Sequence, residues 1–472
     1  MLSVHLLALQ GAAVPPKHHA ALAAFGKGAQ TDARVELPNK LFQFCVEQPE
    51  LRREFFMGKR FLLGMLVVTL TVIVCGAVEG GSLSKQKSLR MNSLRKQAIK
   101  SIRSEDGDII DCVSIYDQPA FDHPALWNHT IQLAPTYDPT IDEHSKKATA
   151  EREGKEEKNS MVVKQTWRKS GSCPEGTIPI RRIRKHVLLK AESVERYGRK
   201  KPMFSQENAQ LPITRSSHTL LTNRSKAFLL TAGNNYNAAK GDIKVCNPRV
   251  EFDDEYSTSQ VALLTGPYYN FEAIESGWAV NPGVYGDRQT RLFVYWTADA
   301  SQKTGCFDLT CPGFVQTSNE IALGSAIYPI STPNGLPYEI IMFLFRDFKT
   351  DNWWVQYGES INIGYWPPEL FGALSHTAET VQWGGEVYST KIGRPPHTRT
   401  AMGSGRFPDF ISGTSGWVKR MRVRDNSMVL MFPGWVEHYS DEYDCYDVDF
   451  IRDYLDDPEL YYGGPGKNPR CP

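Results

Sequence analysis

Two glutamates stand in apolar, glycine-rich surroundings of the kind that a reacting carboxyl group needs. Glu275 lies in Ile274-Glu275-Ser276-Gly277-Trp278, and Glu386 lies in Trp383-Gly384-Gly385-Glu386-Val387. A carboxylate beside tryptophan is costly to desolvate unless it is paired or used in a reaction. Two such groups brought face to face can share a proton and act as acid and base on one bond. The sequence therefore makes Glu275 and Glu386 candidate catalytic residues for hydrolysis.

The residues alone leave a plainer interpretation open, because a strand glutamate is most often a solvated outward residue. The sequence contains no other motif that predicts a catalytic site as well as this pair. The chain has no G-x-S-x-G nucleophile motif, no H-E-x-x-H and no phosphate-binding loop. Its cysteines and histidines lack the spacing of metal ligands. We therefore expect neither a metal nor a cofactor.

Strand alternation predicts which side chains share a face with each glutamate. Around Glu386 the odd positions from Val381 to Val387 are apolar or glycine and should face the core, whereas the even positions should line a site. The candidates for binding substrate or stabilising an oxyanion are Gln260, Gln382 and Tyr388, and Tyr295 is a candidate aromatic wall. Ordinary polar strand positions, and core packing of the aromatic residues, are the alternatives.

The elements that must position these residues are predicted to be strands. From about Ala227 onward, short aromatic and β-branched runs alternate with Gly, Pro, Asn and Asp, which is typical of an antiparallel β-sandwich. The fold class is therefore all-β. Two segments are expected to be helical: residues 367–378, whose apolar side chains recur at helical spacing, and the basic residues 79–105. Residues 140–170 are charged and predict a flexible linker.

The N-terminal region predicts export. Met57-Gly-Lys-Arg is followed by an apolar run from Phe61 to Val78 that ends in small residues, so residues 57–78 have the parts of a signal peptide. Residues 1–56 are then an upstream extension, and a membrane-anchoring helix is the alternative. The expected location is extracellular or apoplastic, with the vacuole as a variant. Lys and Arg (54) balance Asp and Glu (53), so no nucleic-acid partner is expected.

Export favours disulfide bonds. Cys306 and Cys311 bracket a tight loop, Cys445 and Cys471 bracket the C-terminus, and Cys112 with Cys173 could close a loop in the middle region. Sequence cannot prove this connectivity. Cys246 is the candidate for the unpaired thiol. Two sequons predict glycosylation at Asn128 and Asn223.

Longer strings resemble the neprosin family, plant secreted glutamic peptidases with an N-terminal activation region. The resemblance runs from about residue 83 to the C-terminus and includes the segments 107–112, 118–124, 172–182, 274–278, 364–367, 383–387 and 462–466. It implies a β-sandwich catalytic domain behind an activation peptide, and an endopeptidase that cleaves at proline-containing sites. The family's two catalytic glutamates lie in the strings that contain Glu275 and Glu386.

The resemblance and the residues together give an expected organisation. Residues 79–215 form the activation peptide, or prosegment, and residues 216–472 form the catalytic domain. The expected partners are peptide or protein substrates and the chain's own prosegment as inhibitor, in a monomer. Basic prosegment residues are expected to cover an acidic cleft and leave it at acidic pH; a folding aid without pH sensing is the alternative. A glycoside hydrolase using the same carboxylates or a non-catalytic extracellular module are the rival functions.

Overall fold

The computed structural model describes residues 96–137, 139, 164–191, 193, 195–202, 223–411, 413–452 and 457–472. The expected upstream extension and signal peptide lie outside the described residues, as does most of the expected charged linker. Within the described part of the chain, no helix has the length and apolarity needed to cross a membrane.

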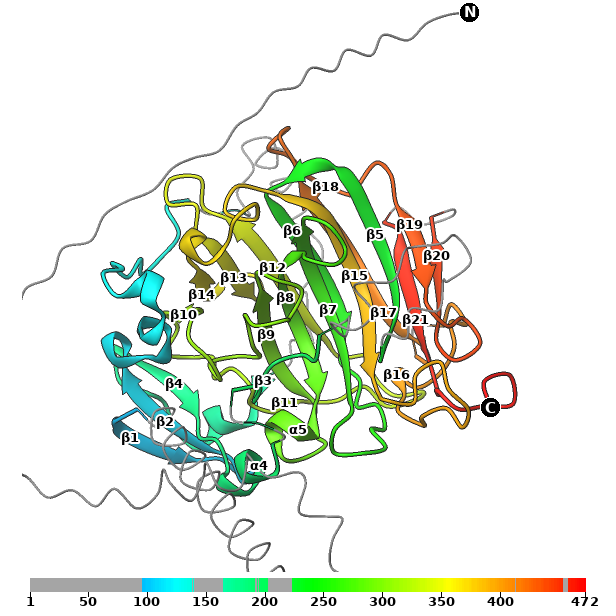
Figure 1. Cartoon of the computed structure of the whole chain (residues 1–472), viewed down its shortest axis with the longest axis horizontal. Coiled ribbons are helices and arrows are strands. Elements are labelled where there is room, and N and C mark those ends of the chain that lie inside the picture. The colour runs from blue at the N-terminus through cyan, green and yellow to red at the C-terminus, as the bar shows by residue number, and fades with distance from the viewer. Residues whose placement is uncertain are drawn as a thin grey trace, which may run out of the picture. The chain divides into compact units, whose positions relative to one another are not determined.

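Two antiparallel sheets form the larger part of the fold (Figure 1). The ten-stranded sheet has the order β10-β14-β13-β12-β6-β17-β21-β16, with β18 beside β17 and β20 beside β21. Its strands are β6 (Ala238–Lys244), β10 (Val315–Gln316), β12 (Glu339–Arg346), β13 (Trp353–Tyr357), β14 (Ile361–Trp366), β16 (Met402–Gly403), β17 (Gly416–Arg424), β18 (Leu430–Met431), β20 (Asp447–Ile451) and β21 (Glu459–Gly464).

The six-stranded sheet has the order β19-β5-β15-β7-β8-β9. Its strands are β5 (Arg224–Tyr236), β7 (Tyr256–Thr265), β8 (Glu272–Val280), β9 (Arg291–Thr297), β15 (Ala378–Tyr388) and β19 (Glu437–Ser440). Two short helical elements accompany the sheets, α5 (Pro282–Tyr285) and η6 (Pro368–Leu370).

The residues before the sandwich add a small sheet of their own, β1 (Ala98–Arg103), β2 (Ile109–Ser114) and β4 (Thr177–Arg181). A two-residue strand, β3 (Lys164–Gln165), pairs with β11 (Ile327–Tyr328) of the larger domain. The remaining elements are η1 (Ile115–Asp117), η2 (Pro119–Asp122), η3 (Pro124–Leu126), η4 (Thr166–Lys169) and α4 (Lys185–Lys190). The protein is thus an all-β sandwich preceded by a smaller β-rich unit, as the sequence predicted.

Buried indoles join the two sheets of the sandwich. Trp278 of β8 and Trp383 of β15 are fully buried. Their Nε1–H groups donate to the Lys244 carbonyl at 2.8 Å and the Lys240 carbonyl at 2.9 Å, both on β6 of the other sheet. A buried indole needs such a partner, because an unsatisfied N–H costs free energy in an apolar interior. Strand alternation then turns the side chains next to these tryptophans toward the opposite, outer face of the sheet.

The helix expected over residues 367–378 is wrong. Only Pro368–Leu370 forms a 3-10 turn, and β15 begins at Ala378. The Glu272 carboxylate instead accepts the N–H groups of Gly372 at 2.9 Å and Leu374 at 2.7 Å. The apolar residues at helical spacing are still buried in the core. Tertiary hydrogen bonds therefore satisfy backbone groups that a helix would have paired internally.

The helix expected over residues 79–105 is also wrong where the structure describes it. Residues Ala98–Arg103 form β1, which pairs with β2. Ile102 packs in a small cluster with Ile110 and Trp167, next to the Cys112–Cys173 bridge. Burial of this side chain against Trp167 and the hairpin ladder to β2 override the helical spacing of the sequence.

The described residues form three disulfides, and they are the pairs favoured by the sequence: Cys112–Cys173, Cys306–Cys311 and Cys445–Cys471. Cys246 is a buried free thiol. Of the two sequon asparagines, Asn128 is exposed and Asn223, directly before β5, is partly exposed. Glycosylation of either stays a prediction.

Candidate active site

Glu275 and Glu386 lie on the same outer face of the six-stranded sheet, on either side of β7. In the register of the sheet, Glu275 on β8 is opposite Ala262 of β7, and Glu386 on β15 is opposite Thr258 of β7. These β7 positions are four residues apart, so the two glutamates are offset diagonally across β7 on the same face. The glycine beside one of them allows this close packing, because a Cβ on Gly277 would overlap the Ser259 carbonyl oxygen.

A single ammonium group contacts both carboxylates. Lys200 Nζ lies 2.7 Å from Glu275 Oε2 and 3.1 Å from Glu386 Oε1. The lysine side chain is only 1% exposed. Its Nζ also lies 4.8 Å from the centre of the Tyr295 ring, at cation–π distance. A buried ammonium would be costly alone, and its contacts with the two carboxyl groups offset that cost.

Glu386 is surrounded by groups that favour its ionised form. Tyr256 Oη donates to Glu386 Oε1 at 2.7 Å, and Lys226 Nζ lies 3.5 Å from Oε2. Burial opposes ionisation, but Lys200, Arg224 and Lys226, together with the tyrosine hydrogen bond, outweigh it and hold the pKa of Glu386 well below its usual range. The surroundings of this carboxyl group therefore favour its anion.

The other candidate residues lie around this pair at different distances. Gln260 is on β7 between the two glutamates, is 7% exposed, and its Oε1 has no hydrogen-bond partner among the described residues. Tyr388 stacks on Tyr256, with ring centroids 5.4 Å apart. Tyr295 faces Glu275 across the β8–β9 ladder, and its hydroxyl hydrogen-bonds with Ser301. Gln382 is partly exposed; it is opposite Ala262 of β7, the same residue that is opposite Glu275 on β8.

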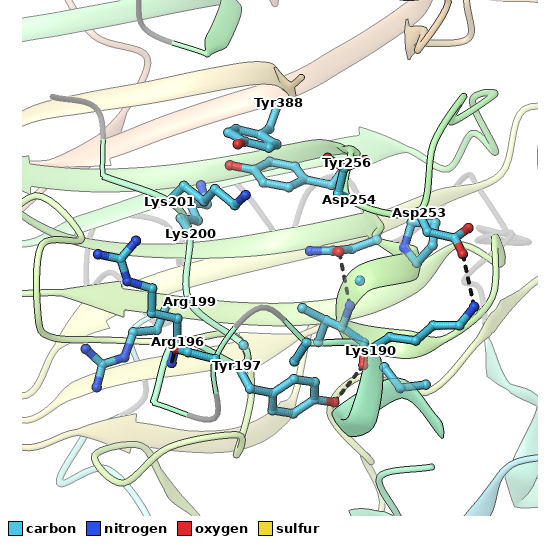
Figure 2. A pocket seen from close by; sticks show the side chains of 18 of the residues that line it. Lys190, Arg196, Tyr197, Arg199, Lys200, Lys201, Asp253, Asp254, Tyr256 and Tyr388 are labelled. Carbon is cyan, nitrogen blue, oxygen red and sulfur yellow. Dashed lines mark hydrogen bonds and ion pairs between the residues drawn. The ribbon is translucent and has the colours of Figure 1, made fainter. Parts of the chain in front are cut away.

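Lys200 belongs to residues Tyr197–Pro202, a segment that crosses the site and that we call the strap. Gly198 accepts a hydrogen bond from the Phe307 N–H at 2.7 Å, and the Lys201 carbonyl accepts one from Arg224. Tyr197 Oη donates to the Val284 carbonyl at 2.8 Å. The strap lines a cavity of about 260 Å³, together with Tyr256 and Tyr388 (Figure 2). Polar contacts at both ends thus hold Lys200 in place.

A buried ion cluster fixes the small N-terminal sheet to the sandwich. Asp108, from the turn before β2, lies 2.5 Å from Arg291 Nη1 of β9 and 3.1 Å from Arg181 Nε of β4. Burial opposes the charge of the aspartate, but the two arginines hold the pKa of Asp108 below its usual value. This cluster is a second charged contact between the segment that carries the strap and the sheet that carries the glutamates.

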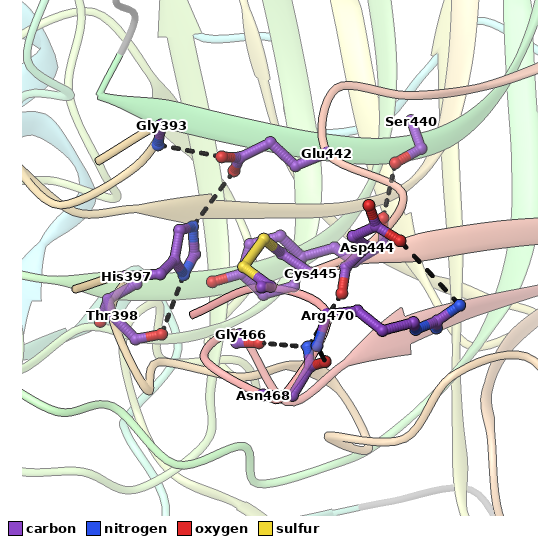
Figure 3. The surroundings of a disulfide bond; sticks show 12 residues. Gly393, His397, Thr398, Ser440, Glu442, Asp444, Cys445, Gly466, Asn468 and Arg470 are labelled. Carbon is purple, nitrogen blue, oxygen red and sulfur yellow. Dashed lines mark hydrogen bonds and ion pairs between the residues drawn. A yellow bond between two sulfur atoms is a disulfide. The ribbon is translucent and has the colours of Figure 1, made fainter. Parts of the chain in front are cut away.

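The described residues offer one group with metal-ligand spacing, His397 with Cys445 and Cys471. Both sulfurs are in a disulfide and the histidine pairs with Glu442 at 3.3 Å (Figure 3). A disulfide has no thiolate that could bind a metal, so we interpret this group as a structural cross-link near the C-terminus.

Sequence reasoning missed Lys200, Tyr256 and Arg224 as residues of the site. Lys200 is 75 residues from Glu275, and Tyr256 is 130 residues from Glu386. No local pattern links such positions. The one usable signal was the basic string Arg199-Lys200-Lys201 ahead of a proline, which is unusual next to a predicted acidic cleft.

Two sequence profiles match the chain. The neprosin profile matches residues 253–465, which contain both glutamates, and the neprosin activation peptide profile matches residues 101–224, which contain the strap. The chain belongs to the neprosin family. It is accordingly a peptidase with its own activation peptide. The profile order along this neprosin-family chain agrees with the small N-terminal sheet followed by the sandwich.

Solved structures give a distant likeness to this neprosin-family chain. Scytalido-glutamic peptidase with a peptide-based transition state analog is 9% identical, covering 51% of this chain and 97% of that chain, with a TM-score of 0.27. SCP-B, a member of the Eqolisin family of peptidases in a complex with the tripeptide Ala-Ile-His, is 8% identical, covering 51% and 96%, with a TM-score of 0.26. The family assignment rests on the two sequence profiles.

Proposed function

We propose that the chain is a secreted glutamic endopeptidase, with Glu275 and Glu386 as its catalytic pair, that cleaves proline-containing peptides at acidic pH. The observation that supports the proposal most directly is the Lys200 ammonium, which contacts both carboxylates from within the matched activation peptide. An inhibitory segment whose single ammonium group pairs with two carboxylates is well suited to block a site in which both carboxylates react. Here Lys200 occupies the position that a reacting water would need.

In the proposed reaction a water takes the place of Lys200 Nζ after the strap leaves. Glu386, which its neighbours favour as an anion, accepts a proton from this water. The water oxygen then forms a bond to the peptide carbonyl carbon. Glu275 donates a proton to the leaving nitrogen as the carbon–nitrogen bond breaks. The proton that Glu386 took from the water then passes to Glu275, and the pair returns to its starting state. No covalent enzyme intermediate is needed.

Gln260 is the proposed stabiliser of the negative oxygen in this reaction. It lies on β7 between the two glutamate-bearing strands, and its amide is nearly buried. A prepositioned amide donor at a developing oxyanion typically contributes about 10²–10³-fold in rate. Tyr295 and Tyr388 are proposed to bind substrate side chains, the first through its ring face near Lys200 Nζ. Gln382, in line with Glu275 across β7, is proposed as a further substrate contact.

The contact between Lys200 and the glutamates also explains how the uncut chain is kept inactive. We call the form with the strap against the glutamates closed, and the form without it open. In the closed form the pKa of Glu386 lies below its usual value, and it moves back toward that value when Lys200 leaves. The open form therefore binds protons more readily than the closed form, and acid favours opening. The Lys200 contact stabilises the closed form above the usual carboxyl range, and this stabilisation is lost as the pH falls toward the depressed pKa. We propose that the prosegment is released in this way.

The test is a digest of a proteome-derived peptide library by the acid-treated full chain and by Glu275→Gln and Glu386→Gln variants. Each variant should lose at least about 10²–10⁴-fold in cleavage rate. Glu379→Gln is the matched control, because Glu379 is exposed on the same strand as Glu386. Cleavage that survives in both site variants contradicts the proposal. Release of reducing sugar from polysaccharide instead would favour the glycoside hydrolase, and no product from either substrate would favour a binding module.

A further inference from the structure

The strap lies against the two glutamates as a stretch of polypeptide, so its backbone contacts mark where this part of the sandwich can bind backbone. Two strap carbonyls receive hydrogen bonds from the sandwich. Gly198 O accepts from the Phe307 N–H at 2.7 Å, and Lys201 O accepts from the Arg224 guanidinium. Lys200, whose ammonium lies between the glutamates, is inside this interval. The two donors therefore flank the candidate reacting centre along the peptide.

Both donors belong to ordered parts of the sandwich. Arg224 is the first residue of β5 and is 3% exposed, opposite Tyr388 in the register of β5 with β15. Phe307 is fully buried, and its ring packs at 5.1 Å from that of Tyr295. A buried arginine has little freedom to reorient, so binding a carbonyl costs little additional ordering. Burial disfavours the arginine charge, but the acidic groups of the site outweigh it and raise the pKa of Arg224.

We propose that Arg224 and the Phe307 N–H are the substrate-backbone donors of this peptidase, binding two peptide carbonyls three residues apart on opposite sides of the bond to be cut. The proposal rests on the proposed peptidase function and adds the orientation of the substrate. The peptide runs in the direction of the strap, so Arg224 binds the carbonyl on the C-terminal side and Phe307 the one on the N-terminal side. Arg224 is thus assigned a binding role that local sequence patterns do not reveal.

The test uses acid-activated enzyme and a set of peptide substrates, each with one backbone carbonyl replaced by a thioamide. Sulfur is a weaker acceptor than oxygen. With the wild-type enzyme, two carbonyls three residues apart should be sensitive, one on each side of the cleaved bond. Arg224→Gln should lower kcat/KM by about 10–100-fold, the range for a hydrogen bond with a charged donor. In that variant the C-terminal thioamide should cost no further activity, while the N-terminal thioamide should cost as much as before.

Two further variants keep the result interpretable. Arg224→Lys retains the charge and should recover part of the rate, and Arg470→Gln, which removes an exposed arginine, should behave as wild type. A purely structural role of Arg224 would lower the rate on all substrates equally, and that result overturns the inference. The inference is also overturned if Arg224→Gln removes the effect of the N-terminal thioamide instead of the C-terminal one. If Glu275→Gln and Glu386→Gln retain activity, the proposed function itself fails, whatever the thioamide series shows.

Discussion

The Tyr256 hydroxyl donates a hydrogen bond to Glu386 Oε1 at 2.7 Å, on the same oxygen that Lys200 approaches to 3.1 Å. One carboxylate oxygen thus has a neutral donor that stays with the sandwich and a charged donor that belongs to the strap. The tyrosine keeps stabilising the anion when the lysine leaves. This relationship distinguishes Glu386 from Glu275 and supports its proposed role as the base.

Replacing Tyr256 with phenylalanine should shift activation toward neutral pH. The variant removes one donor to ionised Glu386, so the pKa of that carboxyl rises and a smaller fall in pH protonates it. A hydrogen bond to a charged group contributes about 1.5–3 kcal/mol, which corresponds to about 1–2 pH units. The measurement is the pH of half-maximal prosegment release, followed by intact mass. A downward shift would contradict the assigned hydrogen bond.

Lys200→Gln should abolish latency. Removing one member of a buried ionic cluster typically costs about 3–5 kcal/mol, because the remaining charges lose their partner. The prosegment should then leave at pH 7, where the wild-type chain stays intact. Lys201→Gln is the matched control, because the Lys201 ammonium lies over the Tyr388 ring, 5.6 Å from its centroid. Equal behaviour of the two variants at pH 7 would show that the bridge to the glutamates is not what holds the strap.

Gly198→Ala should also weaken the closed form, by geometry instead of charge. Gly198 has a φ of +79°, and a Cβ built on it would overlap the Thr310 side chain. An alanine is strained in this conformation. We expect faster strap release at a given pH, and partial rescue when Thr310 is changed to glycine in the same chain. Limited proteolysis within the strap measures this, and an unaltered cleavage rate would argue against the observed path of the strap.

The disulfides should differ in their contribution to stability according to the loops they close. The Cys445–Cys471 pair spans 26 residues, and the chain-entropy relation gives about 3.5 kcal/mol for its loss. The Cys306–Cys311 pair spans 5 residues, and the same relation gives about 2 kcal/mol. Denaturant unfolding of the two Cys→Ser double variants, at neutral pH with the prosegment present, measures both. A larger loss from the shorter loop would show that local geometry outweighs loop entropy.

The sequence predicted the inward and outward side chains of β15 correctly. The structure buries Val381, Trp383 and Val387 in the core and places Glu386 on the outer face. The period of two follows from strand geometry, so it can be read without any knowledge of neighbouring strands. The family resemblance and the all-β fold class were likewise accessible, and both are confirmed.

Non-local hydrogen bonds explain what could not be predicted. Residues 367–378 have helical spacing, but the Glu272 carboxylate, about 100 residues away, binds their N–H groups. In the sequence, Lys200 is one of several polar residues near the boundary between the prosegment and the catalytic domain. Only the fold brings it into contact with two carboxylates. In each case the deciding partner is distant in sequence, and no local pattern carries information about it.

The contact between Lys201 and Arg224 has a consequence for how activation proceeds. The strap ends at Pro202 and β5 begins at Arg224, yet the carbonyl of Lys201 binds that arginine, so the two ends of the intervening segment lie together. Cutting this segment does not by itself remove the strap from the cleft; it converts an intramolecular inhibitor into a dissociable one. Before the cut, a displaced strap returns at the high effective concentration of a tether. After the cut, dilution decides whether it returns, so one proteolytic event turns a reversible acid response into a permanent one.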